Sequence, residues 1–593
     1  MRKTITLFLG LFLFLTVQAQ SKTVNSATPG TLSTILTADE LNTITNLTIT
    51  GTIDARDFVT LRDNLPLLEV LDISNITLTA YIGIDGTSNI LNDTIYSENE
   101  LPRYSFYNNK NQKAKTSLKT IFLPNSITSI GNYSFRLCSG LKSVSMPNSL
   151  NSIGNNAFAN CTGLASVTIP EKVTLIKQYA FYYCTGLTSI IIPDSVASIG
   201  ISAFESCTGL ADVTVGKSVT LIDRSAFYNC SGLIGIIIPN TVKTMGDFVF
   251  YNCSKLASIT IGNSVTRIGL SAFCNCISLL SVTIPNSVST INSSAFYNCS
   301  ALTTAMIGNG VTSISDNAFR GCISLTDVTI GNAVTSIGDA TFAECPSLTN
   351  ITIPNSVVSL GNNIFYLCDK LTNVSIGNAV TSIGNLAFFH CTILTNINIP
   401  NSVTRIGNDA FNSCTLLKNV IIPNTVTSLG NSAFYYCNSF TSLTIPQSIT
   451  SIGNNAFDAC FKLSSIYAYS PNPIDLSAAY QIFANVNKTT CILYVPTGSK
   501  TLYQTASQWK DFQNIIEFTT SLQPINQTNI KITVESGKLS ISNVGIGRKV
   551  QIYTVSGVKV KEQSLESEQT DILLPTGVYV LRVGNYSEKV IIK

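Results

Sequence analysis

Charged side chains are scarce in this sequence. They make up 12% of its 593 residues, and a formal net charge of +3 comes with no cluster of Lys or Arg. A protein that binds nucleic acid needs a concentrated basic surface to neutralise phosphates. The scarcity of charge therefore excludes a nucleic-acid partner, and it predicts a surface of Ser, Thr and Asn around repeated aliphatic residues.

Histidine is almost absent, and His390 is the only one. A catalytic triad needs a histidine beside a nucleophile and an orienting acid. No glycine-rich phosphate loop follows a strand pattern, and no cluster of His, Cys and carboxylate residues has metal-ligand spacing. We interpret His390 as a tolerated loop substitution and predict a protein that is not an enzyme, with no catalytic residue, metal or cofactor.

Long apolar runs are also missing: none reaches the length of about 20 residues that a membrane-spanning helix needs. The apolar run at the N-terminus, Leu7 to Val17, is shorter, and it follows Arg2 and Lys3. A basic start, a short apolar run and a small residue such as Ala19 are typical of an export signal. We therefore expect a signal peptide over residues 1–19, cleavage between Ala19 and Gln20, and an exported chain without a membrane span.

What the sequence has in abundance is one repeated unit. From Leu118 to Lys462 the chain repeats every 23 residues, fifteen times and without an insertion; one unit is LTNITIPNSVVSLGNNIFYLCDK, residues 348–370. Position 1 of the unit is Leu (Phe in the last unit), position 7 is Pro or Gly, position 18 is Phe and position 21 is Cys. Positions 10 and 13 are aliphatic or Met.

Such a period indicates a solenoid in which each unit is one coil and equivalent apolar residues stack on one another. The opening L-x-x-I-x-I predicts a short strand whose positions 1, 4 and 6 face inward, ended by Pro or Gly. The second half predicts a short helical or irregular return on the convex side. Parallel strands about 4.8 Å apart would make the array about 70 Å long.

Seventeen cysteines in an exported chain would ordinarily suggest disulfides. Fifteen of them, however, share position 21, so that their Cα–Cβ bonds are parallel, which suits the S–S torsion of about 90° poorly. We therefore predict a ladder of buried free thiols. The other two, Cys274 and Cys491, have no companions that would make a metal site.

The segments on either side of the repeats differ in pattern. Residues 20–117 and 463–517 are expected to cap the open ends of the solenoid. A polar linker, residues 518–529, then leads to residues 530–593, where alternating apolar residues predict a small β-sandwich of six or seven strands. This sandwich has glycine turns at Gly557 and Gly577.

The unit L-x-x-I-x-I-P-x-S-V-x-x-I-G-x-x-A-F-x-x-C closely resembles the BspA-type bacterial leucine-rich repeat. The resemblance covers residues 118–462 and implies a leucine-rich-repeat solenoid that acts as an adhesin or interaction protein at a bacterial surface. Its implied partner is an extracellular protein, from host matrix or from another bacterium.

The last 65 residues resemble a type A C-terminal sorting domain of the type IX secretion system. The similarity lies in residues 550–557, in residues 574–580 with Gly577 and Tyr579, and in the end of the chain from Lys589 to Lys593. It implies a Bacteroidetes-type origin and recognition by the secretion machinery. It further implies removal of the domain, with release of the protein or its attachment to surface lipopolysaccharide.

The binding surface is expected on the outward positions 2, 3 and 5 of each strand. These residues form a flat face of hydroxyls and amides, which we interpret either as a concave recognition face or as a solvated strand face whose Thr residues serve β-propensity. The candidate residues are Thr326, Asp327, Thr329, Thr349, Asn350, Thr352, Thr372, Asn373, Ser375, Thr395, Asn396 and Asn398. A stripe of Tyr at position 19 is expected to pack between neighbouring coils.

Protein interaction is thus the leading functional hypothesis, and three alternatives stay open. A carbohydrate-binding or glycosidase function would need clustered exposed aromatics and paired carboxylates. Asp212 and Asp327 are the only acids expected on the strand face. A stiff spacer without a ligand is the second alternative. An ice-binding Thr face is the third, although Asn, Asp, Lys and Ala interrupt the Thr pattern.

Overall fold

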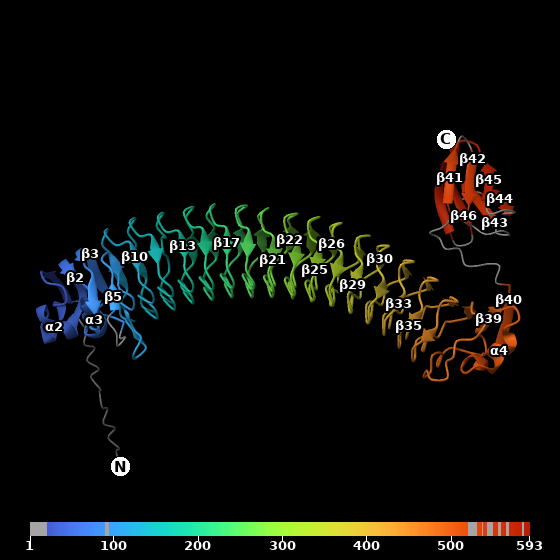
Figure 1. The fold of residues 1–593 in the computed structure, drawn as a ribbon, viewed down its shortest axis with the longest axis horizontal. Helices are drawn as coiled ribbons and strands as arrows, with labels where there is room; N and C mark the ends of the chain where they lie inside the picture. The colour runs from blue at the N-terminus through green and yellow to red at the C-terminus, as the bar shows by residue number, and fades with distance from the viewer. Residues whose placement is uncertain are drawn as a thin grey trace, which may run out of the picture. The chain divides into compact units, whose positions relative to one another are not determined.

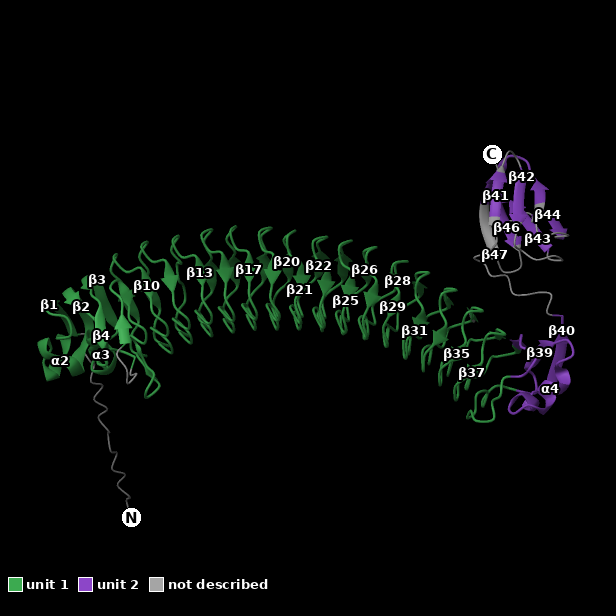
Figure 2. Ribbon diagram, in the orientation of Figure 1, with its two compact units in different colours: residues 1–465, 474–487 green, residues 466–473, 488–593 purple. Residues whose placement is uncertain are grey.

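The computed structural model of the chain describes residues 20–88, 94–519, 531–535, 538–542, 549–554, 559–564, 569–583 and 586–592. The chain forms two compact units (Figure 2), the first comprising residues 1–465 and 474–487 and the second residues 466–473 and 488–593. The boundaries that we expect for the caps and the linker stay predictions. The signal peptide, Ala19 and most of the linker lie outside the described residues.

The first unit is a solenoid of parallel strands, which confirms the predicted fold class (Figure 1). All but one of the fifteen coils open with a strand at positions 3 to 5 or 3 to 6. Where neighbouring opening strands pair, they pair in parallel, and a residue faces the residue 23 positions further along the chain. The coil that begins at Leu164 has no strand at these positions. The opening strands are β9 (Thr120–Phe122), β11 (Ser143–Ser145), β14 (Ser189–Ile191), β16 (Asp212–Thr214), β18 (Gly235–Ile237), β20 (Ser258–Thr260), β22 (Ser281–Ile284), β24 (Thr304–Ile307), β26 (Asp327–Thr329), β28 (Asn350–Thr352), β30 (Asn373–Ser375), β32 (Asn396–Asn398), β34 (Asn419–Ile421) and β36 (Ser442–Ile445).

Every coil also contains a second strand, which the sequence pattern did not predict. It covers only positions 12 and 13, so it has a single inward residue and shows no alternation of polar and apolar residues. These strands pair in parallel with a 23-residue offset. They are β10 (Ser129–Ile130), β12 (Ser152–Ile153), β13 (Leu175–Ile176), β15 (Ser198–Ile199), β17 (Leu221–Ile222), β19 (Thr244–Met245), β21 (Arg267–Ile268), β23 (Thr290–Ile291), β25 (Ser313–Ile314), β27 (Ser336–Ile337), β29 (Ser359–Leu360), β31 (Ser382–Ile383), β33 (Arg405–Ile406), β35 (Ser428–Leu429) and β37 (Ser451–Ile452).

The return side of each coil, positions 14 to 23, is built from turns, so the irregular alternative of our expectation is the one found. Positions 16 and 20 adopt left-handed backbone in every coil, at φ 56° in Asn156 and 62° in Asn160, for example. Amide groups at positions 16, 18 and 20 donate to carbonyls of the next coil, as Phe296 does to Ala318 over 2.7 Å. These bonds satisfy backbone groups that a turn would otherwise leave unpaired in the interior.

Phe and Cys fill the interior on this side. The position-18 rings form one continuous stack from Phe106 to Phe483, with neighbouring ring centroids 5.0–6.0 Å apart. All seventeen cysteines are buried and free, which confirms the predicted thiol ladder. From Cys161 onward, each position-21 thiol donates a hydrogen bond of 3.0–3.3 Å to the carbonyl of the Phe one coil earlier.

The N-terminal segment continues the stacking of the repeats. Its strands β1, β2 and β3 join the sheet of β9 and β11, and β6 pairs with β10. Phe106 stacks on Phe135, and its carbonyl accepts the Cys138 thiol at 3.6 Å. The elements are β1 (Gln20–Ser26), α1 (Leu32–Ile35), α2 (Ala38–Thr43), β2 (Ile44–Ile53), α3 (Ala55–Asp63), β3 (Val70–Leu78), β4 (Tyr81–Gly83), β5 (Thr94–Tyr96), β6 (Glu100–Leu101), β7 (Tyr107–Asn108) and β8 (Lys113–Ala114).

The second unit contains a small all-β part with two antiparallel sheets, of strand orders β41-β42-β45 and β44-β43-β46-β47. Side chains of both sheets, among them Leu539, Val550 and Leu581, share one core. The remaining elements are β38 (Ser465–Ala468), β39 (Ile492–Pro496), α4 (Lys500–Thr505), a 3-10 helix (Trp509–Asp511), β40 (Asn514–Phe518), β41 (Lys531–Glu535), β42 (Lys538–Ser542), β43 (Lys549–Thr554), β44 (Lys559–Ser564), β45 (Gln569–Leu573), β46 (Gly577–Val583) and β47 (Tyr586–Ile592).

The thiol ladder predicts that stability falls at alkaline pH. Burial raises the pKa of the Cys138, Cys253 and Cys460 thiols to about 12, whereas an unfolded thiol titrates near 8.5. Below a pH of about 8.5 the thiols are protonated in both the folded and the unfolded protein. At higher pH the unfolded protein loses these protons while the folded protein keeps them, so the free energy of unfolding decreases as pH rises towards 12. Urea unfolding at about pH 8 and about pH 10 would measure the decrease.

A Cys253→Ala variant isolates the contribution of one thiol. Above the pKa of the unfolded thiol, the unfolding free energy of this variant should fall with pH less steeply than that of the parent. The two slopes should differ by about 1 kcal/mol per pH unit. Identical slopes for the two proteins would contradict a role of this thiol in the pH dependence.

Candidate functional site

The outward side chains at positions 2, 3 and 5 of the opening strands form one surface, here called the strand face. The twelve candidate residues of the sequence lie on it, on four successive coils. In β28 and β30, Asn350 stands beside Asn373 and Thr352 beside Ser375. Thr349, Thr372 and Thr395 are half-buried, and the other nine are exposed. Whether this patch binds a ligand stays a prediction.

Part of this polar patch is used to join the coils. The Thr326 hydroxyl donates to the carbonyl of Thr303 over 3.1 Å, and the Thr372 hydroxyl to that of Thr349 over 3.0 Å. The Asn373 carboxamide donates to the Asn350 side chain over 2.7 Å. Side chains that already have such partners contribute less free energy to ligand binding, because binding would exchange one hydrogen bond for another.

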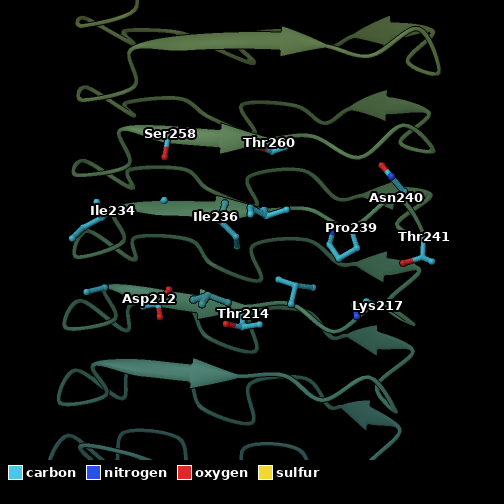
Figure 3. A pocket seen from close by; sticks show the side chains of 15 residues that line it. Asp212, Thr214, Lys217, Ile234, Ile236, Pro239, Asn240, Thr241, Ser258 and Thr260 are labelled. Carbon is cyan, nitrogen blue, oxygen red and sulfur yellow. The ribbon is translucent and has the colours of Figure 1, made fainter.

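A hollow interrupts the strand face several coils before this patch, around β16, β18 and β20 (Figure 3). Its volume is about 1000 Å³, which is the size of a ligand pocket. Position 3 carries Asp212 in β16 and Ser258 in β20, but the coil between them has Gly235. The missing side chain at this position opens the strand face between its neighbours.

Isoleucines make the edge of the hollow apolar. Ile234 and Ile237 flank Gly235 and are 57% and 69% exposed. One coil before Asp212, Ile191 is also 69% exposed at position 5, where most coils carry Thr or Ser. Exposed apolar side chains also occur singly elsewhere on the strand face, such as Leu280 and Met306. A group of them beside a hollow is the kind of surface that marks an interaction site.

Two opposite charges border the hollow. Asp212 is the first residue of β16, and Lys217 follows the end of the same strand. Both line the hollow, and neither forms a salt bridge within the described part of the chain. A ligand can therefore meet a carboxylate at one end of an apolar depression and an ammonium group at the other.

Sequence reasoning named Asp212 only as a rare acid of the strand face and overlooked the hollow. The signal was present as three departures from the repeat, which are Gly at position 3 and Ile at positions 2 and 5 of a single coil. Periodicity indicates the residues that recur, whereas this hollow is produced by residues that do not recur.

His390 lies on the return side at position 20, with its Nδ1 3.0 Å from Oδ1 of Asp369. Both side chains are nearly half exposed, and a pair of this kind contributes little to stability. Within the described ranges, no three His, Cys, Asp or Glu side chains are grouped to hold a metal ion. No helix in the same ranges has the length and apolar character needed to cross a membrane.

The residues that resemble a sorting motif are only partly described. Gly557 and Lys593 lie outside the described residues, and Lys589 belongs to β47. Gly577 begins β46. Tyr579 is buried in the core of the small β part, and its hydroxyl donates to the Pro575 carbonyl over 3.1 Å. Gln20, the expected first residue after cleavage, begins β1.

Comparison with known proteins gives two family matches. Residues 99–506 match the BspA type leucine rich repeat region in six overlapping copies, which together cover more than half of the chain. Residues 519–592 match a domain of unknown function, DUF6383. None of the curated proteins matches this chain.

Several solved structures are also similar. A leucine-rich repeat protein from Bacteroides ovatus is 27% identical, with 59% of this chain and 87% of that chain covered and a TM-score of 0.49. A leucine rich cell surface protein from Faecalibacterium prausnitzii is 28% identical, with 55% and 83% covered and a TM-score of 0.34. The leucine rich repeat protein of T. pallidum is 30% identical, with 31% and 78% covered and a TM-score of 0.25.

The hollow leads to a prediction about which glycines the fold requires. A Cβ at Gly235 would come close to the Ser258 hydroxyl oxygen, at 2.8 Å, and into ordinary contact with the Ser258 carbonyl oxygen, at 3.6 Å; the exposed hydroxyl can rotate away. Gly235→Ser should therefore keep or raise the unfolding free energy, by up to about 0.5 kcal/mol, because serine restricts the unfolded chain. Chemical denaturation would measure the change.

Gly216→Ala is the contrasting variant. Its Cβ would meet the Pro193 carbonyl oxygen at 2.2 Å, which cannot move without shifting a neighbouring coil, so a loss of about 2 kcal/mol is expected. If Gly235→Ser were as damaging as Gly216→Ala, the glycine of the hollow would be a requirement of folding.

Proposed function

The chain belongs to the BspA type leucine rich repeat family, and from this premise we propose that it is an extracellular scaffold that binds a protein ligand on its strand face. The observation that carries the proposal is the hollow at Gly235 with the exposed Ile234 and Ile237 beside it. Repeat scaffolds of this kind offer long surfaces to extended partners.

The chemistry of the hollow specifies the ligand more closely. Its occupant is an extended peptide segment that inserts an aliphatic side chain between Ile234 and Ile237. A basic residue of the segment faces Asp212, and an acidic one faces Lys217, so that the charges of both sides are complementary. The flat polar patch from Thr326 to Asn398 is a secondary contact surface in this proposal.

A selection with phage-displayed random linear peptides tests the proposal on the full chain. Enriched peptides should combine a basic, an aliphatic and an acidic residue in one short segment. Ile237→Thr, which restores the residue type common at position 5, should weaken such a peptide about tenfold, because burial of the isoleucine is lost. Fluorescence titration of a labelled peptide gives the dissociation constant.

Ile421→Thr is the matched control, since Ile421 is also an exposed isoleucine at position 5 but lies on β34. This variant should bind with unchanged affinity. If the affinity of the enriched peptides is unchanged in Ile237→Thr and in Gly235→Asn but lowered in Thr352→Ala, the binding site is the polar patch and not the hollow. The absence of any enriched sequence class would count against the interaction function itself.

We also propose that residues 530–593 direct secretion and that export begins with removal of residues 1–19. Support comes from the resemblance of the terminal motifs and from the small antiparallel β part of its own core that carries them. Recovery of the protein from the surface of its bacterium should yield chains that begin near Gln20 and lack the last strands. Mass spectrometry that finds exported chains intact to Lys593 would contradict removal of the domain.

A further inference from the structure

A second depression lies on the return side of the coils, remote in the repeat from the strand face. Its volume is about 300 Å³, and it is lined by Arg136, Asn156, Asn160, Tyr179, Tyr182 and Glu205. These residues come from four successive coils and occupy only positions 16, 19 and 20 of the unit. All six side chains are half-buried.

Ala159 creates this depression. It occupies position 19 between Arg136 of the preceding coil and Tyr182 of the following coil. Where neighbouring coils both carry large residues at position 19, the side chains stack, as Tyr228 and Tyr251 do with ring centroids 4.9 Å apart. The methyl group of Ala159 is buried beneath its neighbours and leaves a gap one coil wide.

The polar groups around the gap lack protein partners. Among the described residues, none forms a hydrogen bond or ion pair with the side chains of Arg136, Asn160 or Glu205. Nε of Arg136, like Nε of Arg320 in a later coil, is buried without a hydrogen-bond partner, and the Arg136 guanidinium is held over the rings of Tyr107 and Tyr133. A buried donor left without an acceptor is costly.

The same chain contains a second copy of this arrangement in which the arginine has a carboxylate partner. Arg320, Ala343 and Tyr366 repeat the sequence Arg, Ala, Tyr at position 19 of three successive coils. There, position 20 is Glu344, whose Oε1 lies 2.7 Å from Nη2 of Arg320. In the first copy that position is Asn160, and so Arg136 has no carboxylate to bind.

We propose that the depression at Ala159 binds a neutral pyranose residue of a glycan. Sugar hydroxyls both donate and accept, and they match the donors of Arg136, the acceptor of Glu205 and the carboxamides of Asn156 and Asn160. Tyr179 and Tyr182, which pack edge-to-face with ring centroids 5.5 Å apart, both line the depression, and the partial negative charge on an aromatic face attracts the C–H groups of a sugar ring. The volume suits a single ring.

The pair of charges decides between ligand classes. A free phosphate or a sugar carboxylate would gain from Arg136, but Glu205 in the same small depression would repel it. A neutral polyhydroxyl compound can form hydrogen bonds with both groups and is repelled by neither. The strand face takes no part in this site, so the proposal stands independently of the peptide-binding function.

Ligand-observed NMR on the full chain tests the proposal, with the methyl glycosides of glucose, galactose and mannose as probes. Saturation transfer from protein to ring C–H protons is expected for at least one probe, with millimolar affinity. Asn160→Glu should recreate the Arg320–Glu344 pair at Arg136 and weaken that probe about tenfold or more. Ala159→Tyr should abolish binding by filling the gap.

Glu344→Asn is the matched control and should leave binding at the first site unchanged. Because Glu and Tyr already occupy these positions in other coils, both test variants should unfold at the parent's temperature. No transfer to any of the three probes would overturn the proposal. So would equal binding by parent and Asn160→Glu, or methyl glucuronide binding more tightly than every neutral probe.

Discussion

Each coil is held to the next through the carbonyl of its position-18 phenylalanine. In most coils this oxygen accepts the amide of the Cys three residues later and the thiol of the Cys in the following coil, as Phe273 does with Cys276 and Cys299. The ring of the same residue stacks on its two neighbours. Both interactions recur at a fixed offset, so one inserted residue would displace an entire coil from the core. The absence of insertions over fifteen units follows from this constraint.

Packing constrains the inward positions, whereas the outward positions can vary. The residues that distinguish one coil of this chain from another therefore lie on its surface. Most outward residues follow the repeat as Ser, Thr or Asn, and many of their side chains bond to the equivalent residue one coil away. Functional candidates arise where a small residue interrupts a column. Gly235 interrupts position 3 of the strand face, and Ala159 interrupts position 19 of the return side. The first gap is apolar and the second polar, so the two faces suit different partners.

Much of the fold could be predicted from the sequence because each inward position recurs fifteen times. The opening strands, the Phe stack and the free-thiol ladder are of this kind. The second strand could not be predicted, since its two residues carry no alternation. The left-handed conformation at positions 16 and 20 was equally hidden, because bulky residues such as Tyr179 and Leu386 adopt it there. Hydrogen bonds to the next coil stabilise a backbone conformation that the side chains alone would not favour.

The sequence by itself determined that this chain is a solenoid of 23-residue coils, which residues face its interior and why its thiols are not paired. Periodicity is a property of the sequence alone, and each coil needs only its neighbours. The tertiary structure decided which outward side chains meet. Arg136 and Asn160 are brought to one depression by the stacking of coils, and so are Asp212 and Ser258 on the strand face. Whether such residues enclose a gap depends on the size of the side chain between them, and that becomes visible only when the coils are stacked.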